Sequence, residues 1–308
     1  MEIINSPVQM QALADAWHSS NKIIGFVPTM GFLHDGHKSL ISKARQKSDV
    51  VVVSIFVNPT QFGPNDDLDK YPRDIENDKS ICESANVDVV FVPTVSGIYP
   101  NGNSLVVSDV DLSKKLCGMF RPGHFDGVTT VMSKLLSIIS PDLCFMGNKD
   151  AQQQIILRKM VRDLFFNCEI VGCPTVREDT GLALSSRNSY LSAEEHEKAE
   201  LVNASLEMFS QQLLTSNSSD FEIDKTLNEC RERLFEAGLE VQYFEFVDRH
   251  SLDSVSEIVH GNYLLCVAVM CGSTRLIDNY SIDVDENGIV EIDRGIKTSD
   301  LVSENFYG

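Results

Sequence analysis

Apolar, β-branched runs alternate with amphipathic segments through the first half of the chain. The run Val50–Val53 is the clearest, and such near-continuous apolar stretches are typical of strands buried on both faces. We expect strands at residues 23–30, 49–58, 87–93, 105–110, 143–147 and 169–174, and helices between them at residues 37–48, 73–86, 127–139 and 149–164. This alternation predicts an α/β fold with a doubly wound, mostly parallel, Rossmann-like sheet. Such sheets bind ligands at the carboxyl ends of their strands.

The pattern changes after about residue 175. Charged amphipathic helices are expected at residues 192–214 and 221–238, followed by strands at residues 241–248, 262–272 and 274–284. The string DENG, at residues 285–288, predicts a turn into IVEID and therefore a C-terminal hairpin. We expect two domains, residues 1–175 with the parallel sheet and residues 176–308 with a smaller α+β fold that ends in this extension.

Charge and composition narrow the range of partners. The 308 residues include 45 acidic and 26 basic ones, which gives a formal net charge of −19. A chain this acidic repels phosphate backbones, so no nucleic-acid partner is expected, although one pocket can still be locally basic and bind a small anion. We expect no membrane partner, because no run of about 18 uninterrupted apolar residues occurs and the first residues do not resemble a signal peptide. The eight cysteines are scattered without a CxxC pair, which favours buried, reduced thiols in a cytoplasmic protein.

The first chemical signal is the segment PTMGFLHDGHKSLI, at residues 28–41, where the first major strand gives way to a helix. Gly31 and Gly36 permit a ligand to approach the backbone closely. His37 falls at the predicted helix N-terminus, where free N–H groups and the helix dipole favour an anion, so His34 and His37 can both point at one phosphate. The alternatives are two surface histidines in a turn and, less favourably, a zinc site.

The turn His34–His37 resembles that of the nucleotidylyltransferase superfamily, and the string PTMGFLHDGH resembles the pantoate–β-alanine ligase family. Further segments agree in order, and the resemblance runs from about residue 3 to residue 280. They are SIFVNPTQFGPNDDLDKYPRD (54–74), FRPGHFDGVTTVMSKLL (120–136), MGNKDAQQQIILRKMVRDL (146–164), VREDTGLALSSRNSYLS (176–192) and TRLIDN (274–279).

The resemblance implies a reaction in which ATP adenylates the carboxylate of pantoate and β-alanine then attacks the adenylate, giving pantothenate, AMP and pyrophosphate. It also implies Mg²⁺ accompanying ATP, a homodimer, and a division in which residues 1–175 bind ATP and pantoate while the smaller domain forms a lid. The resemblance places ATP against Met30, Gly31, Phe32, Leu33, His34, Asp35, Gly36, His37, Gly147, Asn148, Lys149, Asp150, Val176, Leu184, Ser185, Ser186 and Arg187.

Four of these residues are implied to be catalytic. His34 and His37 would hold the phosphates, with His37 favoured as the proton donor. Lys149 would neutralise phosphate charge, and its unfavourable place at a helix start itself favours an anion-binding role. Arg187 would clamp the departing pyrophosphate with its forked guanidinium, although a surface charge is the alternative.

The resemblance assigns pantoate to Gln61 and Gln153, whose amides both donate and accept hydrogen bonds. For Gln153 the alternative is a solvated helix face formed by residues 152–154. Asp78 lies where the family places a metal-associated acid. Arg121 and His124 would either reach a ligand or order the turn at residues 118–124.

Two departures from the family accompany these matches. Asn148 stands where a Glu is frequent, and Thr180 stands where an Asp is usual. The chain also continues beyond the family pattern after about residue 283, in the predicted hairpin.

Two other functions remain as alternatives. A simple nucleotidylyltransferase would leave a nucleotide on its product, and a nucleotide-sensing regulator would bind ATP without acceptor chemistry. The strings NPTQF and KDAQQ, which carry the candidate pantoate residues, weigh against both alternatives. A tRNA ligase is disfavoured by the acidic charge.

Overall fold

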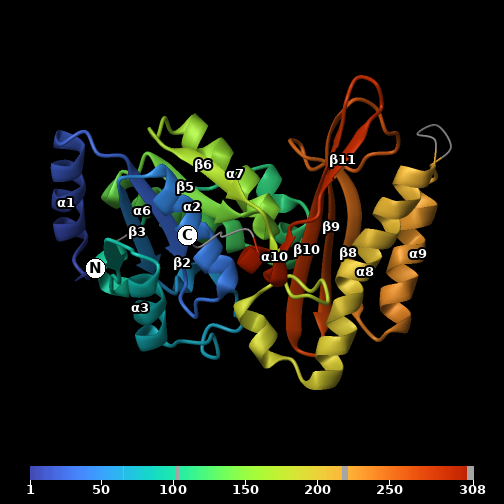
Figure 1. Cartoon of the computed structure of the whole chain (residues 1–308), viewed down its shortest axis with the longest axis horizontal. Coiled ribbons are helices and arrows are strands. Elements are labelled where there is room, and N and C mark those ends of the chain that lie inside the picture. The colour runs from blue at the N-terminus through green and yellow to red at the C-terminus, as the bar shows by residue number, and fades with distance from the viewer. Residues whose placement is uncertain (65, 102–103, 217–220, 304–308) are drawn as a thin grey trace. The chain divides into compact units, whose positions relative to one another are not determined.

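The computed structural model describes residues 1–64, 66–101, 104–216 and 221–303, which form two compact units (Figure 1). Unit 1 comprises Met1–Gly147 and Gln152–Cys173, and unit 2 comprises Asn148–Ala151 and Pro174–Ser303. Residues 304–308 of the expected second domain lie outside the described residues.

Unit 1 is built on a parallel six-stranded sheet in the order β1-β4-β3-β2-β5-β6. The strands are β1 (Glu2–Ile4), β2 (Ile24–Thr29), β3 (Val50–Ile55), β4 (Val89–Phe91), β5 (Leu143–Gly147) and β6 (Glu169–Cys173). The helices are α1 (Pro7–Ser19), α2 (Asp35–Lys47), α3 (Ile75–Ser84), α4 (Val95–Ile98), α5 (Cys117–Phe120), α6 (His124–Ile139) and α7 (Ala151–Asp163). After β2 the chain adds strands on one side and then returns to add β5 and β6 on the other. The sheet is therefore doubly wound, as expected, with its switch point between β2 and β5.

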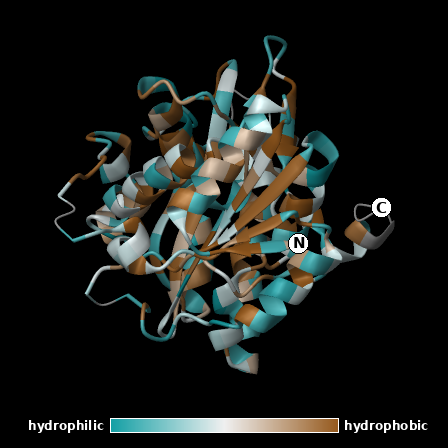
Figure 2. Ribbon diagram, turned by 90° about the vertical axis from the view of Figure 1, so that its left-hand side faces the viewer, coloured by the Kyte–Doolittle hydropathy of each residue, from teal (hydrophilic) through white to brown (hydrophobic). Residues whose placement is uncertain are grey.

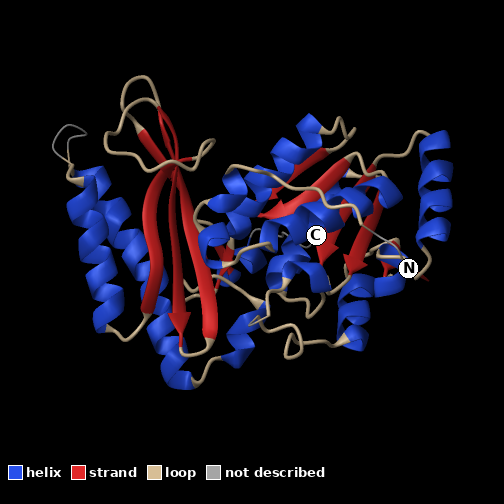
Figure 3. Cartoon of the chain, turned by 180° about the vertical axis from the view of Figure 1, so that it is seen from behind, coloured by secondary structure: helices blue, strands red, loops and turns tan. Residues whose placement is uncertain are grey.

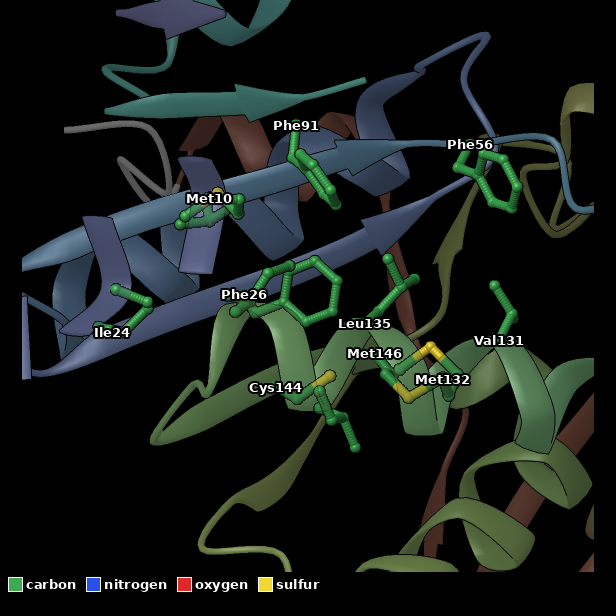
Figure 4. Close-up of a cluster of buried hydrophobic side chains, with 14 of the residues drawn as sticks. Met10, Ile24, Phe26, Phe56, Phe91, Val131, Met132, Leu135, Cys144 and Met146 are labelled. Atoms are coloured by element: carbon green, nitrogen blue, oxygen red, sulfur yellow. The ribbon is translucent and has the colours of Figure 1, made fainter. Parts of the chain in front are cut away.

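Both faces of this sheet are buried, which explains the continuous apolar runs (Figure 2). On one face Phe26 and Phe91 pack with Met10 of α1 and Leu135 of α6 (Figure 4). On the other face the strands meet α2 and α3 in a second cluster that includes Val27, Val51, Ile41 and Cys82. Burying each large apolar side chain stabilises the fold by about 1.5–3 kcal/mol.

The strand expected at residues 105–110 is wrong, because this segment is irregular. Two threonines of α6 take the place of a neighbouring strand. Val107 donates its backbone N–H to Thr130 Oγ1, and its carbonyl accepts from Thr129 Oγ1. Leu105 and Val106 are exposed, so the apolar run does not mark a core strand.

Unit 2 contains a four-stranded antiparallel sheet in the order β11-β10-β9-β8 (Figure 3). The strands are β8 (Glu240–Asp248), β9 (Gly261–Cys271), β10 (Thr274–Val284) and β11 (Val290–Asp293). Helices α8 (Ala193–Thr215) and α9 (Ile223–Glu236) pack on this sheet through Phe209, Leu234 and Phe244, all fully buried. The expected C-terminal hairpin is confirmed, since β10 and β11 pair around the DENG turn.

A smaller parallel pair completes unit 2. It joins β7 (Val176–Arg177) to β12 (Ile296–Lys297), which leads into α10 (Thr298–Ser303). The sequence patterns did not predict this pair.

All eight cysteines are free thiols, and all except Cys168 are buried. Burial raises the pKa of Cys82, Cys168 and Cys230 to about 12, so these thiols stay protonated near neutral pH. Within the described ranges no helix has both the length and the apolar character needed to cross a membrane.

Candidate active site

The unit 1 candidates follow three neighbouring strands of its sheet. His34 and His37 follow β2, Gln61 follows β3, and Gly147 ends β5 shortly before Gln153. Because the three strands are parallel and adjacent, their carboxyl ends share one edge of the sheet. These candidates therefore lie around the switch point, where doubly wound sheets bind ligands.

The two histidines start helix α2 together. His34 is the N-cap residue, and its Nδ1 accepts from Gly36 N at 3.1 Å. His37 Nδ1 in turn accepts from His34 N at 3.2 Å, and the two ring centroids lie 4.1 Å apart. An Nδ1 atom that accepts from a backbone N–H carries no proton, so each neutral imidazole holds its proton on Nε2. The turn thus sets both rings as Nε2–H donors.

Asp78 of α3 fixes the backbone that precedes these histidines. Its carboxylate oxygens accept from Phe32 N at 2.9 Å and from Leu33 N at 2.7 Å, and the residue is 1% exposed. Burial raises the pKa of Asp78, while the two backbone N–H groups act in the opposite direction. Gly31 has φ +85°, and a Cβ there would lie 2.9 Å from Asp78 Oδ2, so the turn requires glycine at this position.

These contacts give Asp78 a structural role that the sequence patterns did not indicate. Both oxygens are already bound to backbone N–H groups, so the assignment of Asp78 to a metal stays a prediction without support from its surroundings. Within the described ranges no group of three or more His, Cys, Asp or Glu side chains is placed to hold a metal ion.

Gln61 is oriented by Asn58, a residue that sequence reasoning missed. Asn58 is 1% exposed, and its Nδ2 donates to Gly127 O and to Gln61 Oε1, each at 3.1 Å. Gln61 Oε1 is therefore an acceptor, and Gln61 Nε2 is the donor end of the amide, 3.1 Å from Met30 Sδ. The signal available in the sequence was an Asn directly before Pro59, within the string that carries Gln61.

Tyr99 and Thr60 determine which end of the Asn58 amide donates. Their hydroxyl oxygens lie 2.8 and 2.9 Å from Asn58 Oδ1 and 3.0 Å from each other. A carbonyl oxygen can only accept, so at least one of the two hydroxyl hydrogens is donated to Oδ1. The Thr60 backbone N–H donates to the same atom at 3.3 Å. Nδ2 is thereby left to face Gln61.

Arg121 and His124 order the loop that carries Gln61. His124 Nδ1 lies 2.8 Å from Gln61 O, and Arg121 pairs with Asp66 at 2.7 Å. Burial would raise the pKa of Asp66, but its bonds to Arg121 and Gly63 N and the nearby positive charge hold that pKa below its ordinary value. The structure therefore favours the ordering role for Arg121 and His124.

The three glutamines at the start of α7 differ sharply, so they do not form one solvated face. Gln152 is buried and bonds Cys117 N, Leu112 O and Lys115 O. Gln154 is buried and donates to Met146 O at 3.1 Å. Gln153 is half-buried and makes no side-chain hydrogen bond within the described part of the chain. Of the three glutamines, Gln153 is therefore the one suited to a ligand.

In unit 2, Lys149 sits in the 3₁₀ turn Asn148–Asp150, which is held by β10. Asn279 is 6% exposed, and its Nδ2 donates to Asn148 O at 3.0 Å and to Lys149 O at 2.8 Å. The sequence motif TRLIDN contains Asn279. Because Asn279 and Asn148 are 131 residues apart in the sequence, this contact could not be predicted from the motif.

The remaining unit 2 candidates lie on the segment from β7 to a second 3₁₀ turn, Ser186–Tyr190. Val176 is buried in β7 and accepts from Leu184 N at 2.9 Å. Ser185 caps the turn, since its Oγ accepts from Arg187 N at 3.3 Å. Ser186 is buried, and Arg187 is half-buried. The segment thus brings Val176, Leu184, Ser185 and Arg187 into one short hairpin.

A buried ion pair supports this hairpin. Both Arg177 Nη atoms bond the Asp278 carboxylate, at 2.5 and 2.8 Å, and the two side chains are only 4% and 2% exposed. Arg177 Nη1 also donates to Gly181 O at 3.1 Å. Planar, bidentate pairing of this kind fixes geometry as well as charge.

Known proteins resemble this chain over most of its length. The family model described as Pantoate-beta-alanine ligase matches residues 2–281. A pantothenate synthetase from Sulfurihydrogenibium is 47% identical, covering 91% of this chain and 99% of the relative, and one from Acetivibrio thermocellus is 45% identical, covering 92% and 100%.

Solved structures give the same result. A pantothenate synthetase from Thermus thermophilus superposes with a TM-score of 0.83 at 38% identity, covering 91% of this chain and 98% of that one. A Francisella tularensis pantoate-beta-alanine ligase, complexed with Beta-gamma ATP and Beta-alanine, has a TM-score of 0.74 at 37% identity, covering 91% and 97%. The chain therefore belongs to the pantoate-beta-alanine ligase family.

Proposed function

We propose that this protein condenses (R)-pantoate with β-alanine at the expense of ATP, giving pantothenate, AMP and pyrophosphate. It is a ligase that forms an amide C–N bond. Membership of the family, together with relatives named pantothenate synthetase, supports this function. The observation that carries the mechanism is the pair of imidazoles held as Nε2–H donors at the switch point of the sheet.

The first step is adenylation. A carboxylate oxygen of pantoate attacks the α-phosphorus of ATP, the bond to the β-phosphate oxygen breaks, and pyrophosphate leaves. Negative charge grows on the phosphate oxygens as this happens, and preorganised N–H donors stabilise it. His34 and His37 supply such donors, and the backbone bonds to their Nδ1 atoms hold the rings in place.

In the second step the neutral amine of β-alanine attacks the acyl carbon of the pantoyl adenylate. The acyl–oxygen bond breaks, AMP leaves with the oxygen that came from pantoate, and the amine loses one proton. Exclusion of water matters here, because a free acyl adenylate hydrolyses.

The acid substrate is proposed to lie at Gln61 and Gln153. Gln61 presents Nε2–H, a neutral donor that can bind a pantoate oxygen without adding a charge that would weaken the nucleophile. Gln153 is the member of its glutamine triplet whose amide is not tied to the backbone. Lys149 is proposed to neutralise phosphate charge, and Arg187 to bind the leaving pyrophosphate.

We propose that Mg²⁺ enters with ATP as part of the substrate. Mg²⁺ prefers phosphate oxygens and retained waters, so it is expected to bind through the phosphates of ATP. When bound, the ion supplies charge neutralisation on the phosphates. Homodimer formation and a cytoplasmic location are also proposed, from family membership and from the free thiols.

A product assay tests this function. Enzyme, ATP, Mg²⁺ and pantoate are incubated with and without β-alanine, with a reaction lacking pantoate as the control. We expect steady release of AMP and an equal amount of pantothenate only when all substrates are present. Release of pyrophosphate without free AMP, with or without the amine, would point to a simple nucleotidyl transfer, and ATP binding without turnover to a nucleotide sensor.

A further inference from the structure

The C-terminal segment of this chain continues beyond the part that matches the family model. The family match ends at residue 281, and the two relatives described above are covered over 99% and 100% of their length by 91% and 92% of this chain. Residues 285–303, which we call the C-terminal strap, follow the end of β10.

The strap forms a strand that pairs with β7, the strand that carries Val176. Its strand β12 pairs with β7, with Ile296 N donating to Thr175 O at 2.8 Å. Arg177 Nε donates to Arg294 O at 2.5 Å, so Arg177 contacts the strap as well as Asp278, its partner in the buried ion pair. The candidate nucleotide strand thus has the strap as its partner in the two-stranded sheet.

The strap also reaches the turn that carries Lys149. Asp293 is oriented by Gly295 N, which donates to its Oδ1 at 2.9 Å, and its Oδ2 accepts from Asn148 Nδ2 at 3.1 Å. Asn279 holds the carbonyl of the same Asn148. The first residue of this turn is therefore fixed at its backbone by β10 and at its side chain by the strap.

Beyond β12 the strap is anchored again. Asp179 Oδ1 accepts from Ser299 N at 3.3 Å, and Leu301 is only 2% exposed. Just before β12, Arg294 pairs with Glu207 of α8 at 3.0 Å. These contacts make the strap an integral part of unit 2.

We propose that the C-terminal strap is a positioning element for ATP binding, which holds Asn148 and β7 in the arrangement that Lys149 and Val176 need to contact the nucleotide. The inference rests on the proposed function for the identity of the ligand. It adds a positioning element that lies outside the family match.

A substitution at Gly295 can displace the strap from β7 without shortening the chain. It has φ +78°, and a Cβ there would lie 2.2 Å from Thr175 O, a backbone atom that cannot swing aside. Gly288, in the hairpin turn, has the same φ of +78° but nothing within 4 Å of its Cβ position. Gly295→Ala and Gly288→Ala therefore share the backbone strain and differ in the clash with β7.

The test measures the dissociation constant of ATP by calorimetry, and then KM for each substrate. We expect Gly295→Ala to weaken ATP binding by about 5- to 10-fold and to leave KM for pantoate and β-alanine within about 2-fold, while Gly288→Ala matches the wild type. A role confined to stability would lower the melting temperature without this split between ATP and the other substrates, and that result would overturn the proposal.

Asp293→Ala provides a second test that leaves the backbone intact. We expect it to weaken ATP binding by about 3-fold, and to have little further effect in the Asn148→Ala background, because both changes remove one contact. The matched control is Glu291→Ala, an exposed acid on the same strand. Unchanged ATP affinity in both Asp293→Ala and Gly295→Ala would refute the strap's role. ATP binding is measured without turnover. Absence of ligase activity in the wild type would therefore contradict the proposed function without deciding the role of the strap.

Discussion

The turn Phe32–His37 and the turn Asn148–Asp150 both carry candidate phosphate ligands, but they are held in different ways. In the first, the stabilising groups are its own imidazoles and one buried carboxylate about 45 residues away, Asp78. The second depends on Asn279 and Asp293, which lie 131 and 145 residues from the groups they contact. Groups within the turn and one carboxylate of unit 1 thus preorganise the histidines, whereas the lysine turn depends on residues of unit 2 that lie 131 and 145 positions away.

The largest expected effect comes from breaking the buried ion pair of unit 2, which supports the hairpin after β7 and whose Asp278 directly precedes Asn279, the residue that holds the lysine turn. Asp278→Asn leaves the buried Arg177 guanidinium without its charge partner, which should cost about 3–5 kcal/mol in the free energy of unfolding. Denaturant unfolding followed by a probe in unit 2 measures this cost. The control is Asp283→Asn on the same strand, whose pair with Arg249 is partly exposed and should contribute less than about 1 kcal/mol. Equal costs for the two variants would contradict the assigned importance of the buried pair.

The next largest effect concerns catalysis by the first region. His37→Ala should lower kcat for adenylation by roughly 10²-fold or more, through loss of one N–H donor to the transition state. Rates of pyrophosphate release measure this change.

A second substitution separates catalysis from turn geometry. His37→Asn offers an oxygen near the position of Nδ1 and so can still accept from His34 N, but it lacks Nε2–H. We expect it to be as slow as His37→Ala while keeping more of the wild-type thermal stability. Near-normal pyrophosphate release from either variant would remove His37 from its catalytic role.

A smaller effect is expected where Gln61 is oriented. Tyr99→Phe removes one donor to Asn58 Oδ1 and should raise KM for pantoate about 5-fold, the equivalent of about 1 kcal/mol, with KM for ATP unchanged. Tyr263→Phe is the matched control, because it removes a buried hydroxyl that donates to Val259 O in unit 2. An equal rise in KM for ATP and pantoate would show general loosening rather than loss of the Gln61 orientation.

The smallest effect is a pH dependence that reports on Asp78. Because burial raises the folded-state pKa of Asp78 above its ordinary value of 3.8, protonation of this group favours the folded state. The contribution of this protonation to the free energy of unfolding is fully present below pH 3.8 and is lost as the pH rises through the folded-state pKa of Asp78. The free energy of unfolding of the wild type, minus that of Asp78→Asn, should therefore fall between pH 4 and pH 7. A rise over this window would contradict the pKa direction.

The sequence patterns predict the parallel sheet well because Val50–Val53 and similar runs are buried on both faces. They mislead at residues 105–110, where threonine hydroxyls of α6 satisfy the backbone in place of a strand. An apolar run alone cannot reveal which groups will take its hydrogen bonds.

The candidate site shows the same limit. The motif around His34 and His37 is contiguous in sequence, and its helix-start geometry follows from local rules. The groups that orient the candidates, such as Tyr99 for Asn58 or Asn279 for the lysine turn, act across long sequence separations. No periodicity or spacing encodes such contacts.

The most direct test of the proposed function follows one oxygen atom. Pantoate labelled with ¹⁸O in its carboxylate is converted with ATP and β-alanine, and the products are analysed by mass spectrometry. Attack of the carboxylate on the α-phosphorus predicts that AMP carries one ¹⁸O atom and that pyrophosphate carries none. Label in inorganic phosphate with formation of ADP, or AMP free of label, would contradict the acyl adenylate on which the account rests.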